Sequence, residues 1–444
     1  MSKTAILTIV SNNYLAHAAT IMRSLSVTNP DYRRFLILSD EPNGSEKRFG
    51  DLFEVVPSSS VGMSHYMDHT IRYDVMEFNT AVKPSAIRWI FDNFDVDHVI
   101  YIDPDTYAYR KFSELDAILS GGCSMVLTPH ITAPLEDGFL PDDHSMLQAG
   151  VFNLGFIAVS RTREALDYLD WWARMLATKC YSDIRNALFT DQKWCDLAPC
   201  FIDDLVILKN PAYNVAYWNL SQRTLSHDDT GNALINGQPL VFFHFSGLRL
   251  DKERIVSKHQ NRLRWSGIGG FREIFSQYRR ELLDHGWAEF SKIGYAYDHF
   301  GDIKIARVIR QFYRTAFPDS QEGTLFTPDF FIRLCNVPSK WAAKGDTVRI
   351  TALQAFVHDQ RPDLQQAFNL SSAKDREAFA HWFESNGPQE YGLDVRFVRQ
   401  HHIQGLAANI PSPAPPPVFH PGRSRGYRRW RKIRRAVLNV LGRP

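Results

Sequence analysis

Two aspartates separated by one residue offer the clearest chemistry in this sequence. Asp103-Pro104-Asp105 follows directly on the apolar run 98–102, which has the composition of a buried β-strand. In an extended chain the side chains of residues two apart point to the same side, so both carboxylates can converge on one cation. Carboxylates suit Mg²⁺ and Mn²⁺, which complete their coordination with phosphate oxygens. A polar turn that only closes the strand is the alternative, because Asp and Pro are common turn residues.

A histidine at the end of another apolar run strengthens the first interpretation. His244 follows residues 240–243 and precedes Phe245-Ser246-Gly247, with Arg249 and Lys252 close behind. Neutral imidazole is an acceptable ligand for Mn²⁺, and the cations that follow would favour phosphates. A histidine satisfied within the core is the alternative. Together the two segments predict a site where a divalent cation meets a diphosphate.

Polar residues also follow or interrupt other apolar runs. Asn12-Asn13-Tyr14 follows the run 5–10, so these polar side chains could contact a ligand at the edge of the sheet. The alternative is that the asparagines cap a helix that starts near residue 15. Asn153 lies within an apolar stretch, where a buried amide needs partners that either a ligand's hydroxyls or the backbone can supply.

Two charged positions have ordinary local interpretations. Asp191-Gln192 follows Thr190, which could cap a helix whose first turn holds Asp191. Lys83 stands before the helical period of residues 86–94 and could be a solvated side chain.

These residues need a scaffold, and the pattern of the chain supplies one. Up to about residue 258, short apolar runs alternate with segments of helical period, which is typical of an α/β fold with a largely parallel sheet. Such folds bind ligands at the carboxyl ends of their strands, where Asp103, Asp105 and His244 are expected to lie. We expect strands at 5–10, 35–39, 53–56, 99–102, 124–128, 155–159 and 240–243, and helices at 15–25, within 64–94 and at 163–177.

Composition sets the class of protein. The 444 residues are 44% hydrophobic and 23% charged, which excludes a wholly disordered chain and indicates two or three domains. No run approaches the roughly 18 apolar residues that a membrane-spanning helix needs. The first residues enter an apolar run directly, so we expect a strand there and no signal peptide. Five irregularly spaced cysteines form neither a disulfide framework nor a zinc pattern, and we expect a reducing cytoplasm.

Beyond residue 258 the pattern becomes mostly helical. We expect a helical appendage over 259–408, a proline-rich linker over 409–422 and a basic tail over 423–444. The tail carries nine Lys and Arg and no Asp or Glu, and removing these nine from the 51 Lys and Arg leaves 42 against 49 Asp and Glu. This mildly acidic body argues against specific nucleic-acid binding. The tail itself either is solvated, lies on an anionic membrane surface, or binds nucleic acid without specificity.

Taken in order, these segments resemble a GT-A-fold glycosyltransferase, closest to the family 8 group that includes glycogenin and bacterial lipooligosaccharide galactosyltransferases. The resemblance covers roughly residues 4–255. One position departs from the family, because Leu250 stands where a lysine is usual, and Arg249 or Lys252 would take its place. The matching pieces are Leu7-Thr8-Ile9-Val10-Ser11-Asn12-Asn13-Tyr14, Lys83, Asp103-Pro104-Asp105, Phe152-Asn153-Leu154-Gly155-Phe156, Asp191-Gln192, Tyr213-Asn214 and His244-Phe245-Ser246-Gly247.

The resemblance implies a metal-dependent enzyme that moves a sugar from a nucleotide donor, expected to be a UDP-sugar, with retention of configuration. Asp103, Asp105 and His244 would hold Mn²⁺ or Mg²⁺, which neutralises charge on the leaving diphosphate. Asn153, Asp191 and Gln192 are the catalytic candidates, and none of them is named as a nucleophile. The nucleotide-sugar would contact Thr8, Val10, Asn12, Asn13, Tyr14, Lys83, Asp103, Pro104, Asp105, Gly247, Arg249 and Lys252. The loop Asn12-Asn13-Tyr14 would hold the base and ribose by hydrogen bonds and stacking. Asp74 is a weaker candidate for a contact to the donor sugar.

We therefore expect a GT-A domain over residues 1–258 that glycosylates a saccharide or lipid-linked acceptor in bacterial surface-glycan synthesis. Its expected location is the cytoplasm, or the inner face of the membrane through the basic tail. A sugar nucleotidyltransferase is one alternative, disfavoured by the lack of an N-terminal Gly-rich phosphate loop. A catalytically silent partner of another transferase is the other, disfavoured by the intact Asp103, Asp105 and His244.

Overall fold

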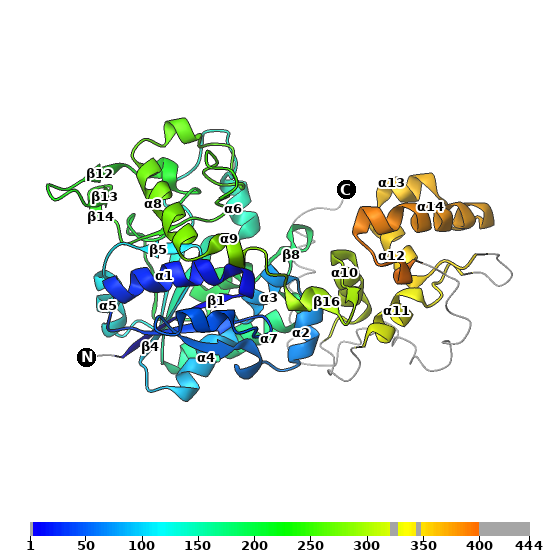
Figure 1. The fold of residues 1–444 in the computed structure, drawn as a ribbon, viewed down its shortest axis with the longest axis horizontal. Helices are drawn as coiled ribbons and strands as arrows, with labels where there is room; N and C mark the ends of the chain where they lie inside the picture. The colour runs from blue at the N-terminus through cyan, green and yellow to red at the C-terminus, as the bar shows by residue number, and fades with distance from the viewer. Residues whose placement is uncertain (1–2, 320–326, 343–347, 399–444) are drawn as a thin grey trace, which may run out of the picture. The chain divides into compact units, whose positions relative to one another are not determined.

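The centre of the structure is a seven-stranded sheet in the order β10-β6-β7-β4-β1-β2-β3 (Figure 1). The computed structural model describes residues 3–319, 327–342 and 348–398. Neighbouring strands in this sheet are parallel except where β7 runs against β4 and β6, so the predicted mixed, mostly parallel sheet is confirmed. Its strands are β1 (Thr4–Val10), β2 (Arg33–Leu38), β3 (Glu54–Pro57), β4 (His98–Ile102), β6 (Met125–Pro129), β7 (Phe152–Ser160) and β10 (Leu205–Ile207).

Helices cover both faces of this sheet, so its inner strands β1, β4 and β7 are buried along their whole length and are mostly apolar. In β1, Ile6 and Val10 join one hydrophobic cluster, whereas Leu7 and Ile9 join a second cluster on the opposite face. This alternation is the period of two that a strand imposes. The first cluster includes α1 (Leu15–Thr28) and α8 (Phe271–Asp284), and the second includes α3 (Val75–Ala81), α4 (Lys83–Asn93) and α7 (Arg163–Lys179).

A smaller sheet in the order β11-β15-β5 stands beside the first and fixes the geometry of the predicted site. Strand β5 (Thr106–Ala108) begins one residue after Asp105, and β15 (Phe242–His244) ends at the candidate histidine. The two strands pair antiparallel, with His244 opposite Thr106. On its other side β15 pairs with β11 (Val215–Ala216). Two segments far apart in the sequence are therefore held side by side by backbone hydrogen bonds.

The remaining elements connect and surround these layers. Their helices are α2 (Tyr66–Arg72), α5 (Ser113–Ser120), α6 (Asp143–Ala149) and α9 (Trp287–Phe290). Their short strands are β8 (Ser182–Asp183), β9 (Leu188–Phe189), β12 (Leu225–His227), β13 (Ala233–Ile235), β14 (Gln238–Pro239), β16 (His299–Phe300) and β17 (Ile303–Lys304).

The C-terminal region is helical, as the sequence pattern predicts. Residues from Ile303 to Val398 form a hydrophobic cluster of their own, to which Ile71 of α2 also belongs. Its helices are α10 (Arg307–Ala316), α11 (Pro328–Asn336), α12 (Ala352–Gln360), α13 (Pro362–Ala367) and α14 (Ala373–Tyr391).

The segment just after residue 258 packs with the sheet. Phe271, Phe275 and Phe290 of α8 and α9 are buried in the same cluster as α1, although the sequence pattern placed these helices in the appendage 259–408. The predicted linker 409–422 and tail 423–444 lie outside the described residues.

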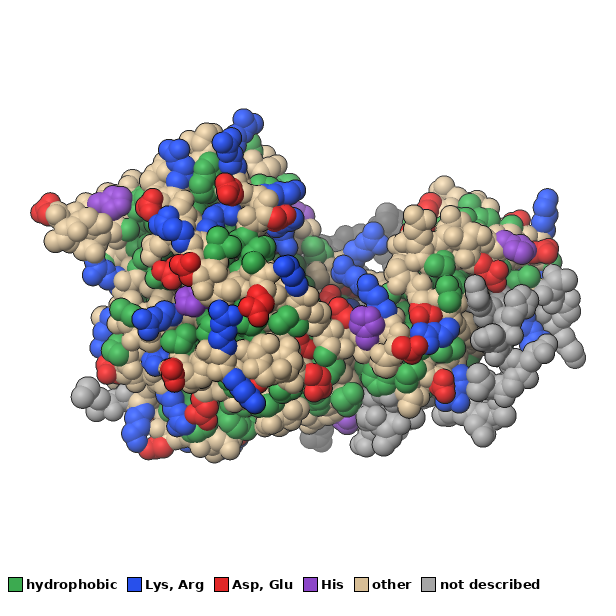
Figure 2. Space-filling model, in the orientation of Figure 1, with side chains coloured by type: hydrophobic (Ala, Val, Ile, Leu, Met, Phe, Trp, Pro, Cys, Tyr) green, Lys and Arg blue, Asp and Glu red, His purple; other side chains and the backbone are tan. Residues whose placement is uncertain are grey.

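The visible surface carries a mixture of charges. On the face drawn in Figure 2, Lys and Arg side chains are interspersed with Asp and Glu side chains, as the near-balanced composition of the body predicts. Within the described ranges, no helix is long and apolar enough to span a bilayer.

Candidate active site

The two aspartates of the first motif lie in a tight turn at the carboxyl end of β4. The Asp103 backbone N–H donates to the carbonyl of Gly155 on β7 (2.8 Å), and the Thr106 hydroxyl donates to the Asp103 carbonyl (2.7 Å). The Phe245 N–H donates to the Asp105 carbonyl (2.7 Å), which joins the turn to the end of β15. The turn is thus fixed by the strands on both sides of it.

The predicted metal ligands converge. His244 Nε2 lies 3.0 Å from Asp105 Oδ1 and 3.6 Å from Asp103 Oδ2, and one ligand atom from each residue lies within 4.8 Å of the other two. The imidazole is buried, whereas the Asp103 and Asp105 side chains retain 29% and 23% of their exposure. Two carboxylates and one imidazole, open on one side, fit Mn²⁺ or Mg²⁺ whose other ligands are phosphate oxygens.

The charges of this cluster are coupled. Burial raises the pKa of Asp103 above its ordinary value. Burial acts in the same direction on Asp105, but the charge and hydrogen bond of His244 outweigh it and lower the pKa of that carboxyl. For His244 burial is likewise outweighed, here by Asp105 and Asp103, and the pKa is raised. A cation that binds His244 must therefore displace the proton that the metal-free cluster favours.

A glycine is needed to bring these groups together. A Cβ on Gly155 would lie 2.4 Å from His244 Cε1 and 2.8 Å from both Asp103 Oδ2 and Asn153 Oδ1. Real Cβ atoms do not approach so closely, so any side chain here would displace the imidazole or the carboxylate. The glycine of the segment Phe152–Gly155 therefore lets the backbone pass close to the cluster.

Behind the histidine, two asparagines form a hydrogen-bonded row. Asn214 Nδ2 donates to Thr128 Oγ1 (2.8 Å) and Asn153 Oδ1 (3.0 Å), which leaves Asn214 Oδ1 to accept from His244 Nδ1 (3.3 Å). Once the Nε2 proton is displaced, this tautomer turns the lone pair of Nε2 toward the aspartates, as a metal ligand requires. Asn153 also accepts from the Gly155 N–H (3.2 Å) and lies 3.3 Å from His130 Nε2. Asn153 thus orients the site from behind.

A buried ion pair stands beside the cluster. Lys83 Nζ lies 2.5 Å from Asp191 Oδ2 and donates to the Leu154 carbonyl (2.8 Å), with both side chains almost fully buried. The same ammonium lies 4.1 Å from the ring centroid of Tyr101, whose hydroxyl donates to Asp103 Oδ1 (2.5 Å). Lys83 and Asp191, which the sequence prediction named separately as site residues, are thus linked to the metal motif through one aromatic ring.

The side-chain amide of Gln192 forms hydrogen bonds with two backbone groups. Its Nε2 donates to the Ala149 carbonyl (3.0 Å), and its Oε1 accepts from the Leu154 N–H (3.1 Å). The side chain therefore ties the end of α6 to β7 while it lines the pocket. Asp74, the weaker candidate, caps α3 by accepting from the N–H groups of Met76 and Glu77.

In the loop that follows β1, some residues line the pocket and others bond to neighbouring parts of the protein. Asn13 and Tyr14 line the pocket, and the Tyr14 ring stacks on His17 at 4.3 Å. Asn12 instead bonds to neighbouring loops, through Asp40 Oδ2 (3.2 Å) and the Glu41 carbonyl (2.8 Å). Thr8 and Val10 are fully buried within β1 and do not line the pocket.

The cations after His244 are arranged differently from the sequence expectation. Arg249 pairs with Asp251 on the surface, and neither Arg249 nor Lys252 lines the pocket. Lys258 and His259 line it instead, beside Gly247, whose φ of +73° favours glycine.

The metal motif, the Lys83–Asp191 pair and Gln192 line one pocket of about 580 Å³ at the carboxyl edge of the sheet. Sequence reasoning missed several of its residues, although His130 follows β6 just as Asp103 follows β4 and the strand-end rule would have found it. Trp218 Nε1 and His17 Nδ1 are buried without a hydrogen-bond partner in the described part of the chain. The residues that line the pocket and were not predicted include His17, Met76, Asn79, Thr80, His130, Tyr217, Trp218, Lys258 and His259.

The sequence is distantly similar to known proteins. No family model matches the sequence. It is 26% identical over 249 residues to the uncharacterized protein YfnF of Bacillus subtilis, spanning 55% of this chain and 81% of that protein. It is 24% identical over 181 residues to YfnD of the same organism, spanning 40% of this chain and 56% of that protein.

The structure also aligns with solved glycosyltransferases. One is the galactosyltransferase LgtC in complex with donor and acceptor sugar analogues (14% identity, TM-score 0.40, 62% of this chain and 95% of that one). Another is the glycosyltransferase GlyE of Streptococcus pneumoniae (15% identity, TM-score 0.38, 66% of each chain). Likenesses this distant do not by themselves assign an activity.

Proposed function

We propose that this chain is a metal-dependent glycosyltransferase of the GT-A type that moves a sugar from a UDP-sugar to a saccharide or lipid-linked acceptor. The observation that carries the proposal is the Asp103–Asp105–His244 cluster in the wall of the pocket. A volume of about 580 Å³ lies within the range of small-molecule sites, and the cluster lies where open α/β folds bind ligands.

The residues around the cluster suit a nucleotide-sugar. Mn²⁺ or Mg²⁺ held by Asp103, Asp105 and His244 would neutralise the charge that develops on the leaving diphosphate. Tyr14 offers a partly exposed ring for a base, and Lys258 adds positive charge to the pocket wall. Of the predicted cations, Arg249 and Lys252 remain candidates for the outer phosphate.

Asp191 and Gln192 have positioning roles in this proposal. The Asp191 carboxylate is occupied by Lys83 and Thr190, and the Gln192 amide by two backbone groups. Both therefore hold the wall that faces the donor sugar. Retention of configuration, action in bacterial surface-glycan synthesis and attachment of the basic tail to the inner face of the membrane belong to the proposal through the family resemblance and composition.

Calorimetric titration of UDP, with and without Mn²⁺, tests the metal and diphosphate site. Native protein is expected to bind UDP more tightly with Mn²⁺, and Asp105→Asn to lose that dependence because it removes one anionic ligand. Asp229→Asn is the matched control, since Asp229 is exposed on a distant loop. Equal UDP binding by native protein and Asp105→Asn would overturn the metal assignment.

Two alternatives predict different titrations. A silent partner of another transferase would bind no nucleotide with or without metal. A sugar nucleotidyltransferase would form UDP-sugar from UTP and a sugar phosphate, which a coupled pyrophosphate assay detects. For the tail, a 1–408 truncation is expected to lose binding to anionic vesicles and keep donor hydrolysis.

A further inference from the structure

Helix α10 lies outside the pocket, yet a buried arginine and a half-buried arginine of this helix contact α2 and α3, and α3 lines the pocket. Arg310 is 1% exposed, and its Nη1 lies 2.6–2.8 Å from the carbonyl oxygens of Thr70, Ile71 and Tyr73. These carbonyls belong to the end of α2, where the last carbonyls of a helix have no N–H donor within the helix and a cation is favoured. Arg310 therefore caps α2 from another helix.

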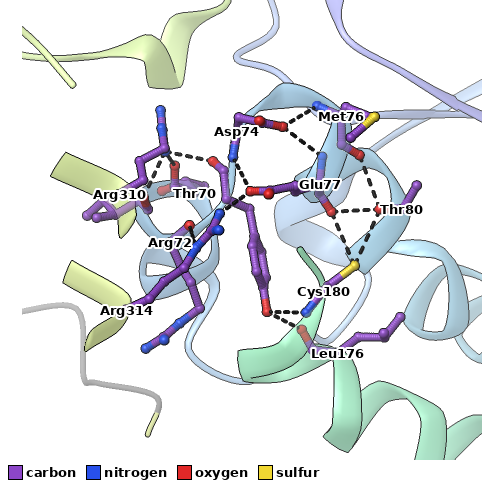
Figure 3. Close-up of polar contacts among 12 residues, drawn as sticks. Thr70, Arg72, Asp74, Met76, Glu77, Thr80, Leu176, Cys180, Arg310 and Arg314 are labelled. Carbon is purple, nitrogen blue, oxygen red and sulfur yellow. Dashed lines mark hydrogen bonds and ion pairs between the residues drawn. The ribbon is translucent and has the colours of Figure 1, made fainter. Parts of the chain in front are cut away.

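Arg314, one turn further along α10, reaches the next helix. Its Nε donates to the Arg72 carbonyl (2.8 Å), and its Nη2 pairs with Glu77 Oε2. The Glu77 side chain is 2% exposed, so Arg314 supplies the counter-charge of a buried carboxylate. Figure 3 shows both arginines reaching the turn between α2 and α3. We call this set of contacts, made by Arg310 and Arg314 on residues 70–77, the α10 junction.

Glu77 in turn fixes the start of α3. Its Oε2 accepts from the Asp74 N–H (3.1 Å), while Asp74 Oδ1 accepts from the Glu77 N–H (3.0 Å), which forms a capping box. The same helix is held on a second side by α7, since Cys180 Sγ donates to the Glu77 carbonyl (3.4 Å) and lies 3.3 Å from Thr80 Oγ1. Helix α3 is therefore set between α10 and α7.

Helix α3 also forms part of the wall of the pocket. Met76, Asn79 and Thr80 line the pocket, and Lys83 follows two residues after the helix ends. A shift of α3 would move these side chains relative to the Asp103–Asp105–His244 cluster. Because packed helices move as rigid bodies, the position of the capping box determines where the whole short helix lies.

We propose that α10 positions the donor pocket: Arg314 and Arg310 hold α3 in the place from which its residues contact the nucleotide-sugar. This inference rests on the proposed function for the identity of the ligand. Arg314 and Arg310 are positioning residues, which act through Glu77 and the end of α2. The C-terminal helical region thereby supports the donor site from outside the pocket.

The test compares Arg314→Met with Phe312→Ala. Phe312 lies on the same helix but packs against Phe356 of α12, so its truncation loosens α10 without touching Glu77. With Mn²⁺ present, Arg314→Met is expected to raise the Kd for UDP five- to tenfold, and Phe312→Ala less than twofold, at temperatures where both remain folded by circular dichroism. Arg314→Lys keeps the charge and is expected to recover part of the affinity.

A double substitution separates positioning from general loss of stability. Glu77→Gln with Arg314→Met removes the unpaired buried charge, and we expect it to bind UDP more tightly than Arg314→Met alone. Equal Kd values for Arg314→Met and native protein, or an equal loss in Phe312→Ala, would overturn the proposal.

Hydrogen exchange of the ligand-free protein provides the readout that does not depend on the donor. Amides of residues 75–81 are expected to exchange at least tenfold faster in Arg314→Met than in native protein, while those of β1 are unchanged. If native protein binds no UDP, the proposed function fails and this exchange experiment still decides the role of α10. Unchanged exchange in residues 75–81 would overturn the positioning role.

Discussion

Two largely buried ion pairs lie near the two ends of helix α3. Lys83 pairs with Asp191 at the wall of the pocket, and Arg314 pairs with Glu77 at the α10 junction. The first pair lies beside a cavity where a ligand can offer new partners, whereas the second is enclosed by backbone and aromatic rings. Similar chemistry thus supports the pocket wall in the first pair and holds α3 in place in the second.

The largest expected effect is on stability, and it should be similar for both pairs. Lys83→Met and Arg314→Met each leave a buried carboxylate without its cation, which costs about 3–5 kcal/mol in the free energy of unfolding. Urea unfolding monitored by circular dichroism measures this loss. Lys83→Met combined with Asp191→Leu should recover most of it, since apolar pairs replace buried ion pairs at little cost. A loss below about 1 kcal/mol at either site would break the comparison.

The next effect should be confined to the pocket. Gly155→Ala places a Cβ within 2.4 Å of His244 Cε1, so we expect Mn²⁺-dependent UDP affinity to fall by more than about 100-fold, beyond the loss caused by disturbing an outer partner of a metal ligand. Calorimetry measures the affinity. Gly294→Ala is the matched control, because a Cβ there meets no atom within 4 Å. Native-like affinity in Gly155→Ala would mean that the cluster does not hold the metal.

His17 in the pocket and Glu77 at the α10 junction should make opposite contributions to the pH dependence of stability. Burial lowers the pKa of His17, a pocket residue, from 6.5 to about 4, so the unfolded chain binds its proton first as the pH falls. This residue's contribution to stability is present above pH 6.5 and is lost on acidification, by about 2 kcal/mol between pH 6.5 and 5. Urea unfolding at several pH values should therefore show a shallower acid loss in His17→Phe than in native protein; parallel curves would contradict this.

Glu77 at the junction should act in the reverse direction. Burial, only partly offset by Arg314, raises the pKa of its carboxyl above 4.5. Its contribution to stability is therefore full below pH 4.5 and is lost as the pH rises through the folded-state pKa. In the same unfolding series, Glu77→Gln should remove this opposing slope and leave an acid loss steeper than that of native protein. An unchanged slope would show that Glu77 does not titrate in this range.

The smallest expected effect concerns two cationic side chains, Lys258 and Arg249. Lys258 lines the pocket, whereas Arg249 pairs with Asp251 outside it. Lys258→Ala is expected to raise the Kd for UDP roughly fivefold, since a partly solvated charge contributes on the order of 1 kcal/mol to a phosphate. Arg249→Ala should change it less than about twofold, as surface pairs are weak. The reverse order in calorimetry would make Arg249, and not Lys258, the main phosphate contact.

The sequence predicted the parts of the site that depend on strand ends. Asp103, Asp105, His244 and Asn153 follow or lie within apolar runs whose strand character is a local property, so their convergence could be foreseen. Lys83 and Asp191 were foreseen only through the family resemblance, because nothing local indicates that residues 108 apart form a pair.

The residues that were missed depend on long-range packing. Lys258 reaches the pocket because the chain turns at Gly247 and the Lys258 N–H donates to the Gly247 carbonyl (3.0 Å), and no periodicity reports such a turn. The α10 junction was invisible for the same reason. An arginine in an amphipathic helix is ordinarily a solvated side chain, and only the fold shows that Arg310 meets three carbonyls of α2.

The burial of α8 beside α1 has a consequence for dividing this protein. Phe275 and Tyr278 of α8 pack against Phe243 and Phe245 at the end of β15, next to His244. A fragment that stops at residue 258 would expose this aromatic surface and lose the support of a metal ligand. The smallest fragment that retains the site therefore continues through α9, and one that retains the capped α2 continues through α10. Exchange of C-terminal regions between related enzymes should respect these junctions.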